Sequence, residues 1–303
     1  MTDHDLVVVG GGVAGLTAAA VAAANGLRVL VLEQLAPGGQ IATIDRIRNM
    51  PGFPEGIAGY ELGPNLQQQA EESGAEIQAD MVTAIEPIED GFQVVGAAQT
   101  VSASAVIIAA GSRRKTLGIP GENAFEGRGV SHCASCDGHF FRGATVVVAG
   151  GGDSAFDEAE VLAEHAAEVI IVHHGRAPAA QRGSVARLEA IPHVTMLADS
   201  ALVAIEGDGG VGSVTVATGD ETRQIPCAGV FVYVGLDPNS DFLGALIERD
   251  ARGAIVADGD LQTRTPGLFA AGDIRSGATA LLASVAGDGA RAALSAVDYL
   301  AQR

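Results

Sequence analysis

The sequence is poor in basic, aromatic and sulfur-containing side chains. Its 303 residues include no tryptophan, three cysteines, and 18 lysines and arginines against 37 aspartates and glutamates, for a formal net charge of −19. This negative charge argues against non-specific binding to nucleic acid or to an anionic membrane. Three cysteines do not make a disulfide framework in a chain of this length, so a Cys-x-x-Cys pair is expected to be redox-active or metal-binding.

Long apolar runs and targeting signals are also missing. No apolar stretch reaches the roughly 18 residues that span a bilayer, and the segment 1–5 carries no basic region of the secretory type. We therefore expect a cytoplasmic location without a membrane partner. Only one Cys-x-x-Cys occurs, without a second Cys/His pair at zinc-finger spacing, which predicts no metal site.

The chain begins with a strand, a glycine-rich loop, a helix, a second strand and an acid. The apolar segment 6–9 leads into the loop 10–15, an alanine-rich helix runs to about Gly26, and the strand 28–32 ends at Glu33. In this fingerprint the glycines let the backbone approach a pyrophosphate at a helix N-terminus, and the acid binds ribose hydroxyls. The pattern predicts a dinucleotide site; the alternative is a glycine-rich turn in an ordinary α/β unit.

A second strand and glycine-rich loop occur at 144–149 and 150–155. The position equivalent to the first acid holds His173, followed by His174 and, two residues on, Arg176. An acid here would favour an unphosphorylated ribose and a basic group a 2′-phosphate, and these residues provide weak positive charge near pH 7. The alternative is a solvated strand end with two incidental histidines.

Each loop unit is followed by a similar run of short strand segments. They lie near 76–85, 92–95, 100–103 and 106–111, and again near 194–197, 201–206, 211–217, 222–225 and 230–235. The segment 268–273 resembles the end of the first run and precedes a final helix at about 279–302, so the C-terminal part is expected to return to the first domain. The predicted fold is α/β, with two Rossmann-like, three-layer ββα dinucleotide-binding domains, the second inserted in the first. The domain boundaries are expected at 1–116 and 245–303 for the first and 117–244 for the second.

The cysteine pair Cys133 and Cys136 can open and close a disulfide within one short loop, and neighbouring groups can make such a thiol a competent thiolate. Asp137 adjoins the pair as a candidate proton donor, with an N-cap or turn residue as the alternative. His132 and His139 are alternative acid–base groups. The third cysteine, Cys227, precedes an apolar strand and is expected to be a buried small hydrophobe.

Together these residues resemble the low-molecular-weight thioredoxin reductases and the wider group of thioredoxin reductase-like flavoproteins, over essentially the whole chain. The matching stretches are Gly10–Gly15 with Glu33, Gly38–Gln40, Asn49–Phe53, Ala109–Gly111, Cys133–Gly138, Gly150–Ala155, Val234–Asn239, Phe269–Asp273 and Ala286–Gly289.

The resemblance implies FAD in the first domain and NAD(P)H in the second. The residues that it matches to the FAD site are Gly10, Gly12, Ala14, Gly15, Glu33, Gln34, Gly39, Gln40, Asn49, Val82, Ala110, Gly111, Gly272, Asp273, Ala280, Leu281 and Leu282. Those that it matches to the NAD(P)H site are Gly150, Gly152, Asp153, Ser154, Ala155, His173, His174, Arg176 and Gly235.

The resemblance also implies roles for the dithiol. Cys136 would face the flavin, Cys133 would attack the partner disulfide, and Asp137 would donate a proton. The implied partner is thioredoxin or another dithiol or disulfide, protein or small molecule, and the family habit is a homodimer. The inserted domain would rotate to present the nicotinamide and the dithiol in turn to the flavin.

Two departures from the family pattern stand out. The family's 2′-phosphate clamp reads His-Arg-Arg with a further Arg four positions on, whereas this chain has His173-His174-Gly175 and then Ala179. Arg176 and Arg182 are the nearby candidates to compensate. Before the last helix, the family's Arg-Gln-Ala is replaced by the segment 280–282, Ala-Leu-Leu.

Three hypotheses follow. The first is an FAD enzyme that passes electrons from a pyridine nucleotide to a protein disulfide through the cysteine pair. The second keeps the dithiol without efficient NADPH use, as a dithiol oxidase that uses oxygen or a reductase fed by another donor such as ferredoxin. The third is a non-catalytic FAD-binding redox sensor.

Overall fold

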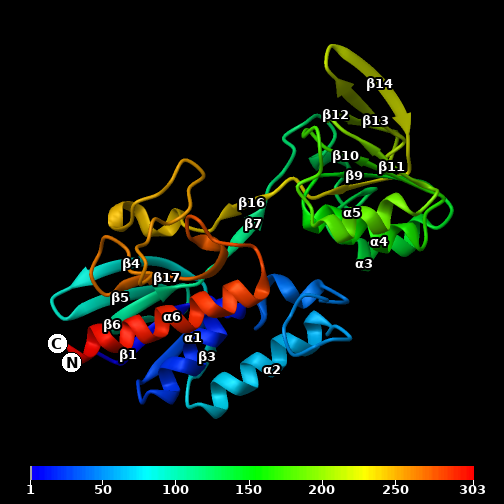
Figure 1. Cartoon of the computed structure of the whole chain (residues 1–303). Coiled ribbons are helices and arrows are strands. Elements are labelled where there is room, and N and C mark those ends of the chain that lie inside the picture. Colours follow the sequence, from blue (N-terminus) through cyan, green and yellow to red (C-terminus); the bar gives the residue numbers. More distant parts are fainter. Residues whose placement is uncertain (1) are drawn as a thin grey trace. The chain divides into compact units, whose positions relative to one another are not determined.

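The computed structural model describes residues 2–303, which divide into two compact units (Figure 1). The first unit ends at Arg113 and resumes with Asp237–Arg303, and the second comprises Arg114–Leu236. The second unit therefore ends at Leu236, eight residues before the expected boundary at 244. The side chain of Asn239 explains the difference, because its amide donates to the Ala110 carbonyl 2.9 Å away and ties this stretch to the first unit.

A seven-stranded sheet forms the centre of the first unit, within the residues that the structure describes. Its parallel strands are β3 (Glu76–Ala79), β2 (Val29–Glu33), β1 (His4–Val9), β6 (Thr100–Ile108) and β17 (Leu268–Ala270). The antiparallel hairpin of β4 (Val82–Ile88) and β5 (Gly91–Gly96) joins β6. The first half of β6 pairs with β5 and its second half with β17, so the meander and the parallel sheet share one strand.

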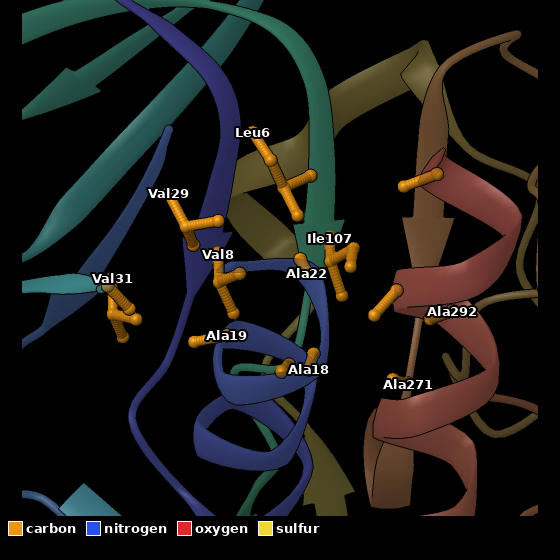
Figure 2. Close-up of a cluster of buried hydrophobic side chains, with 14 of the residues drawn as sticks. Leu6, Val8, Ala18, Ala19, Ala22, Val29, Val31, Ile107, Ala271 and Ala292 are labelled. Atoms are coloured by element: carbon orange, nitrogen blue, oxygen red, sulfur yellow. The ribbon is translucent and has the colours of Figure 1, made fainter. Parts of the chain in front are cut away.

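Helices α1 (Val13–Ala24), α2 (Gly59–Glu72) and α6 (Leu282–Ala301) also belong to this unit. Figure 2 shows Leu6, Val8 and Ile107 of the sheet packing against alanines of α1 and α6 in a buried cluster. Alanine and glycine let the two helices approach closely. A Cβ at Gly289 of α6 would lie 2.2 Å from the Ala14 carbonyl oxygen of α1, so a larger residue would force the helices apart.

The second unit contains a five-stranded parallel sheet in the order β11 (Val194–Leu197), β10 (Glu168–Val172), β9 (Thr145–Ala149), β15 (Gly229–Val232), β8 (Val130–Ser131). A separate antiparallel sheet is formed by β12 (Ser200–Glu206), β13 (Ser213–Thr218) and β14 (Glu221–Pro226). Its helices are α3 (Ala134–Asp137), α4 (Asp153–Ala163) and α5 (Arg182–Glu189). The expected fold class, two Rossmann-like units with the second inserted in the first, is confirmed.

The structure adds two details to the sequence prediction. The strands β3 and β11, at the start of the two expected runs of strand segments, extend the parallel sheets beside β2 and β10. The reason is the same in both units: a helix, α2 or α5, precedes each segment and returns the chain to the parallel edge. The last helix also begins at Leu282, three residues later than expected.

The connections between the units are β7 (Ser112–Arg114) and β16 (Leu236–Pro238), which pair with each other. The short 3₁₀ segments are η1 (Gly39–Thr43), η2 (Asn123–Phe125), η3 (Gly138–Phe141), η4 (Asp241–Leu246), which is kinked at Gly244, and η5 (Gly272–Ile274). None of the helices among residues 2–303 combines the length and apolar character needed to cross a bilayer.

Candidate functional site

The first glycine-rich loop lies between β1 and α1 and has one crowded side and one open side. A Cβ at Gly15 would lie 1.8 Å from the Gly10 carbonyl oxygen, and a Cβ at Gly10 would lie 2.5 Å from that of Ala109. A Cβ at Gly12, in contrast, would meet nothing within 4 Å. Gly10 and Gly15 therefore lie against the backbone of the protein itself, whereas Gly12 faces open space. A loop that binds a pyrophosphate requires this arrangement.

Glu33 stands at the end of β2 beside this loop. Its Oε2 accepts a hydrogen bond from the Gly11 N–H at 2.6 Å, and its Oε1 accepts one from the Leu35 N–H at 2.9 Å. Both bonds fix the carboxylate next to the loop. It is half-buried, which leaves its remaining lone pairs available to ribose hydroxyls.

Asp273 carries a buried polar atom without a partner. Its Oδ1 has no hydrogen bond among the described residues, and burial, followed by the charge of Asp288, raises the pKa of Asp273. The neighbouring Arg275 makes a bidentate pair with Asp288 at 2.6 and 2.8 Å, and Asp288 also accepts from the Gly272 N–H. This pair fixes the backbone around Asp273. The Oδ1 of Asp273 therefore remains as an unpaired acceptor at a fixed position.

The structure brings several predicted FAD residues together. Gly12 forms a β-bridge with Gly38, a Cβ at Gly39 would lie 3.2 Å from the Gly12 Cα, and a Cβ at Gly272 would lie 3.0 Å from the Ala14 Cβ. Ala110 lies beside Gly10, and Gln40 donates to the Ser112 carbonyl at 2.9 Å. No contact to this cluster is described for the remaining predicted residues, which are exposed or half-buried: Gln34, Asn49, Val82, Gly111, Ala280, Leu281 and Leu282.

These features fit FAD. An open glycine loop at a helix N-terminus, an acid beside it and an unpaired buried carboxylate oxygen are the donors and acceptors that a dinucleotide uses. The roles of the individual residues stay predictions.

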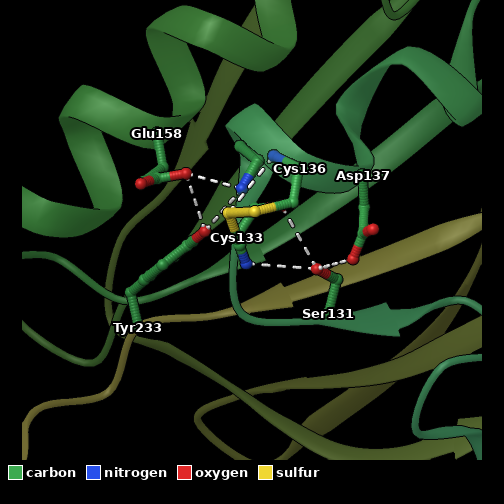
Figure 3. The surroundings of a disulfide bond; sticks show 7 residues. Ser131, Cys133, Cys136, Asp137, Glu158 and Tyr233 are labelled. Carbon is green, nitrogen blue, oxygen red and sulfur yellow. Dashed lines mark hydrogen bonds between the residues drawn. A yellow bond between two sulfur atoms is a disulfide. The ribbon is translucent and has the colours of Figure 1, made fainter. Parts of the chain in front are cut away.

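The cysteine pair lies in the second unit and forms a disulfide (Figure 3). Cys133 caps the short helix α3, and its Sγ accepts from the Cys136 N–H at 3.2 Å. Cys133 is half-buried and Cys136 is exposed, so both sulfurs border the surface of this unit. Cys227 is buried as expected, and burial raises the pKa of its thiol to about 12, which keeps it protonated and unreactive.

Asp137 faces the dithiol through Ser131, a residue that the sequence pattern did not single out. The Ser131 hydroxyl donates to the Asp137 Oδ2 at 2.6 Å and accepts from the Cys133 N–H at 3.1 Å. Ser131 thereby links the Asp137 carboxylate to the backbone of Cys133. Of the two flanking histidines, His132 lies 3.4 Å from the Glu126 carboxylate and contacts the Val232 carbonyl, whereas His139 is exposed against Phe140.

The second glycine-rich loop repeats the geometry of the first. A Cβ at Gly150 would lie 2.2 Å from the Tyr233 carbonyl oxygen, and a Cβ at Gly152 would meet nothing within 4 Å. Asp153 accepts from the Gln181 N–H at 2.6 Å. The other residues predicted around this loop are the buried Ala155 and the exposed Ser154 and Gly235.

The strand end beside this loop carries little positive charge. His173 is 4% exposed, its Nδ1 has no partner among the described residues, and burial lowers the pKa of its ring. His174, Arg176 and Arg182 are exposed. The two clamp positions at which the family has arginine hold the exposed His174 and the half-buried Gly175, and neither an imidazole nor a glycine replaces a bidentate guanidinium on a 2′-phosphate.

The comparisons with known proteins were consistent with one another. The family model described as pyridine nucleotide-disulphide oxidoreductase matches residues 4–290. The thioredoxin reductase of Treponema pallidum (strain Nichols) is 40% identical over 302 residues, which covers 99% of this chain and 98% of that protein. That of Mycolicibacterium smegmatis is 38% identical over 306 residues, covering 100% and 98%. The crystal structure of Lactococcus lactis thioredoxin reductase (FR conformation) superposes with a TM-score of 0.96 at 36% identity, covering 99% of this chain and 100% of that one.

No group of three or more metal-ligating side chains occurs within residues 2–303.

Proposed function

The chain belongs to the pyridine nucleotide-disulphide oxidoreductase family as a thioredoxin reductase-like, FAD-dependent disulfide reductase, and from this we propose that Cys133 and Cys136 reduce a protein disulfide such as that of thioredoxin. The observation that carries the proposal is the disulfide at the surface of its unit, next to a carboxylate, Asp137, that Ser131 links to the backbone of Cys133. A buried structural disulfide would need neither surface access nor an acid.

Three parts of the first unit would bind different groups of FAD. The open loop at Gly12 would hold the pyrophosphate of FAD, Glu33 the ribose hydroxyls, and Asp273 a hydroxyl of the ribityl chain. When bound, FAD supplies two-electron chemistry between a nicotinamide and a disulfide.

Exchange with the partner takes place at sulfur. The Cys133 thiolate attacks one sulfur of the partner disulfide, the partner S–S bond breaks, and a mixed disulfide forms. Asp137 donates a proton to the partner thiolate that leaves. Cys136 then loses its proton and attacks the Cys133 sulfur, which releases the second partner thiolate to take up a proton and restores the Cys133–Cys136 disulfide. The partner gains two electrons and two protons, and the dithiol loses the same.

The choice of electron donor depends on the second loop, which lacks arginines for a 2′-phosphate. We infer that NADPH binds poorly and that either NADH or a donor other than a nicotinamide nucleotide feeds the enzyme. The absence of arginine at the two clamp positions, which hold His174 and Gly175, supports this second candidate function. Losing two charge-assisted bonds of about 1.5–3 kcal/mol each weakens NADPH binding by orders of magnitude.

Anaerobic stopped-flow reduction with each nucleotide tests the donor. If a nicotinamide nucleotide is the donor, NADH bleaches the flavin at least as well as NADPH. The second candidate, a donor other than a nicotinamide nucleotide, holds if neither nucleotide bleaches the flavin while the dithiol, once reduced chemically, still reduces thioredoxin. Rapid and preferential bleaching by NADPH would contradict the inference about the clamp.

A further inference from the structure

A second carboxylate, besides that of Asp137, lies beside the cysteine pair. Glu158 on α4 is half-buried, and its Oε2 accepts a hydrogen bond from the Ala134 N–H at 2.6 Å (Figure 3). Ala134 follows Cys133 directly and is buried. A negative charge is therefore held one residue from a sulfur of the dithiol.

Tyr233, which follows β15, fixes this carboxylate. Its phenol donates to the Glu158 Oε2 at 2.9 Å, and its oxygen lies 3.1 Å from the same Ala134 nitrogen. Burial and then the charge of Glu158 raise the pKa of Tyr233, so its hydroxyl stays protonated near neutral pH and can donate. Two donors on one oxygen favour the charged carboxylate over the neutral acid.

We propose that Glu158, held by Tyr233, is a positioning residue of the dithiol that favours the disulfide over the thiolate and makes the pair a stronger reductant. The inference rests on the proposed role of Cys133 and Cys136 in disulfide reduction. It gives α4 a role in the chemistry of the dithiol, in addition to the role of its N-terminus in the second glycine-rich loop.

The physical reason is the charge balance of the half-reaction. When a dithiol reductant reduces the pair, the S–S bond accepts two electrons and breaks, and the reductant becomes a disulfide. Below the thiol pKa each sulfur binds a proton, and above it one sulfur remains a thiolate. A fixed negative charge nearby disfavours that thiolate. It thereby destabilises the reduced form and lowers the reduction potential, the reverse of the effect that makes a stabilised thiolate a strong oxidant.

Other titratable groups around α3 have different partners. Asp137 is bonded by Ser131, and His132 pairs with Glu126. The remaining groups are His139 on η3, His165 near Gly138, and Arg114, whose positive charge acts on Tyr233. Glu158 differs from them because it bonds the backbone N–H that follows Cys133.

Redox titration of the FAD-loaded chain in dithiothreitol buffers tests the proposal, with thiols counted by alkylation at a series of pH values around that of a free cysteine thiol, about 8.5. A plot of potential against pH bends where the uptake changes from two protons to one. Glu158→Gln keeps the size and an acceptor but removes the charge. The bend is expected to move to lower pH by about 0.5–1 unit, which is roughly 3- to 10-fold more thiolate at a given pH.

Two further variants separate charge from packing. Glu160→Gln, on the same helix but paired with Arg187, serves as the matched control and should titrate like the wild type. Tyr233→Phe removes one of the two bonds to the carboxylate but keeps its charge and the bond from the Ala134 N–H, so the bend of this variant should move to lower pH by less than that of Glu158→Gln.

The proposal is overturned if the plot of potential against pH for Glu158→Gln, as a folded protein that still binds flavin, bends at the same pH as the wild type or at a higher pH. It is also overturned if Tyr233→Phe moves the bend down as far as Glu158→Gln does, because packing would then set it. A wild-type pair that never cycles between disulfide and dithiol would refute the proposed function itself. A pair that cycles with no response to Glu158→Gln refutes only the role of this glutamate.

Discussion

Replacing Asp273 by asparagine should weaken FAD binding and at the same time stabilise the protein without FAD. The Oδ1 of Asp273 is buried without a partner among the described residues, and its pKa is raised by burial and by Asp288. An unpaired buried acceptor costs about 1–3 kcal/mol, and in the proposed site a hydroxyl of FAD would remove this cost by donating to Asp273. Asparagine keeps the shape but lacks the charge.

The magnitude follows from the type of bond. A hydrogen bond to a charged group contributes about 1.5–3 kcal/mol, so Asp273→Asn should raise the Kd for FAD by roughly 10- to 100-fold. Without FAD, removing a buried charge should add about 1 kcal/mol of stability near neutral pH, or roughly 2–4 °C in the unfolding midpoint.

The pH dependence has a definite sign. Because the pKa of Asp273 is raised from its ordinary 3.8, the folded chain holds this proton more tightly than the unfolded chain. The stabilisation from this group is complete below pH 3.8 and is lost as the pH rises through the folded pKa. Asp273→Asn removes this fall in stability.

Titration of the apoprotein with FAD, followed by flavin fluorescence, gives the affinity, and thermal unfolding of the apoprotein gives the stability. Asp260→Asn, at an exposed site paired with Arg291, is the control and should change neither measurement strongly. Unchanged FAD affinity in Asp273→Asn, or an apoprotein that melts at a lower temperature than the wild type, would refute the reasoning.

Four other predictions concern the two loops, the dithiol and the strand end at His174. Gly12→Val should yield a folded protein without FAD, because a Cβ there meets nothing within 4 Å in the fold but enters the space of the pyrophosphate; a yellow purified variant would contradict this. Gly152→Val, equally unhindered, should keep FAD and lose only reduction by a nicotinamide nucleotide, which absorbance spectra and stopped-flow traces would establish. Cys136→Ser should abolish disulfide reduction with FAD still bound, and retained turnover would disprove its role. His174→Arg should improve the use of NADPH relative to NADH by roughly 10-fold if the added bond to a 2′-phosphate forms; it is preferable to a change at Gly175, where a Cβ would lie 2.9 Å from the Ala177 carbonyl oxygen.

Local patterns in the sequence were enough to predict the units and the loops. The strand, glycine and helix signals around Gly10 and Gly150 depend on residues within one short segment, as does the pair Cys133 and Cys136. Helix α2 gave no such signal, because it contains Pro64 and glycines at both 59 and 63.

The contacts that orient the site could not be predicted in this way. The pair Arg275 and Asp288 joins a loop to a helix, and the bond from Tyr233 to Glu158 joins residues 75 positions apart. Which side chains meet across such distances depends on how the sheet and helices pack, and the periodicity of one segment does not contain that information.

The central claim is that the cysteine pair exchanges electrons with a flavin bound to this same chain. Anaerobic titration of the FAD-loaded protein with dithionite measures it without assuming any natural donor. The wild type should take up a second pair of electrons per FAD that a Cys133→Ser, Cys136→Ser double variant does not, and two thiols should become open to alkylation as it does so. Equal electron uptake by the two proteins, with the disulfide left intact in the wild type, would contradict the account.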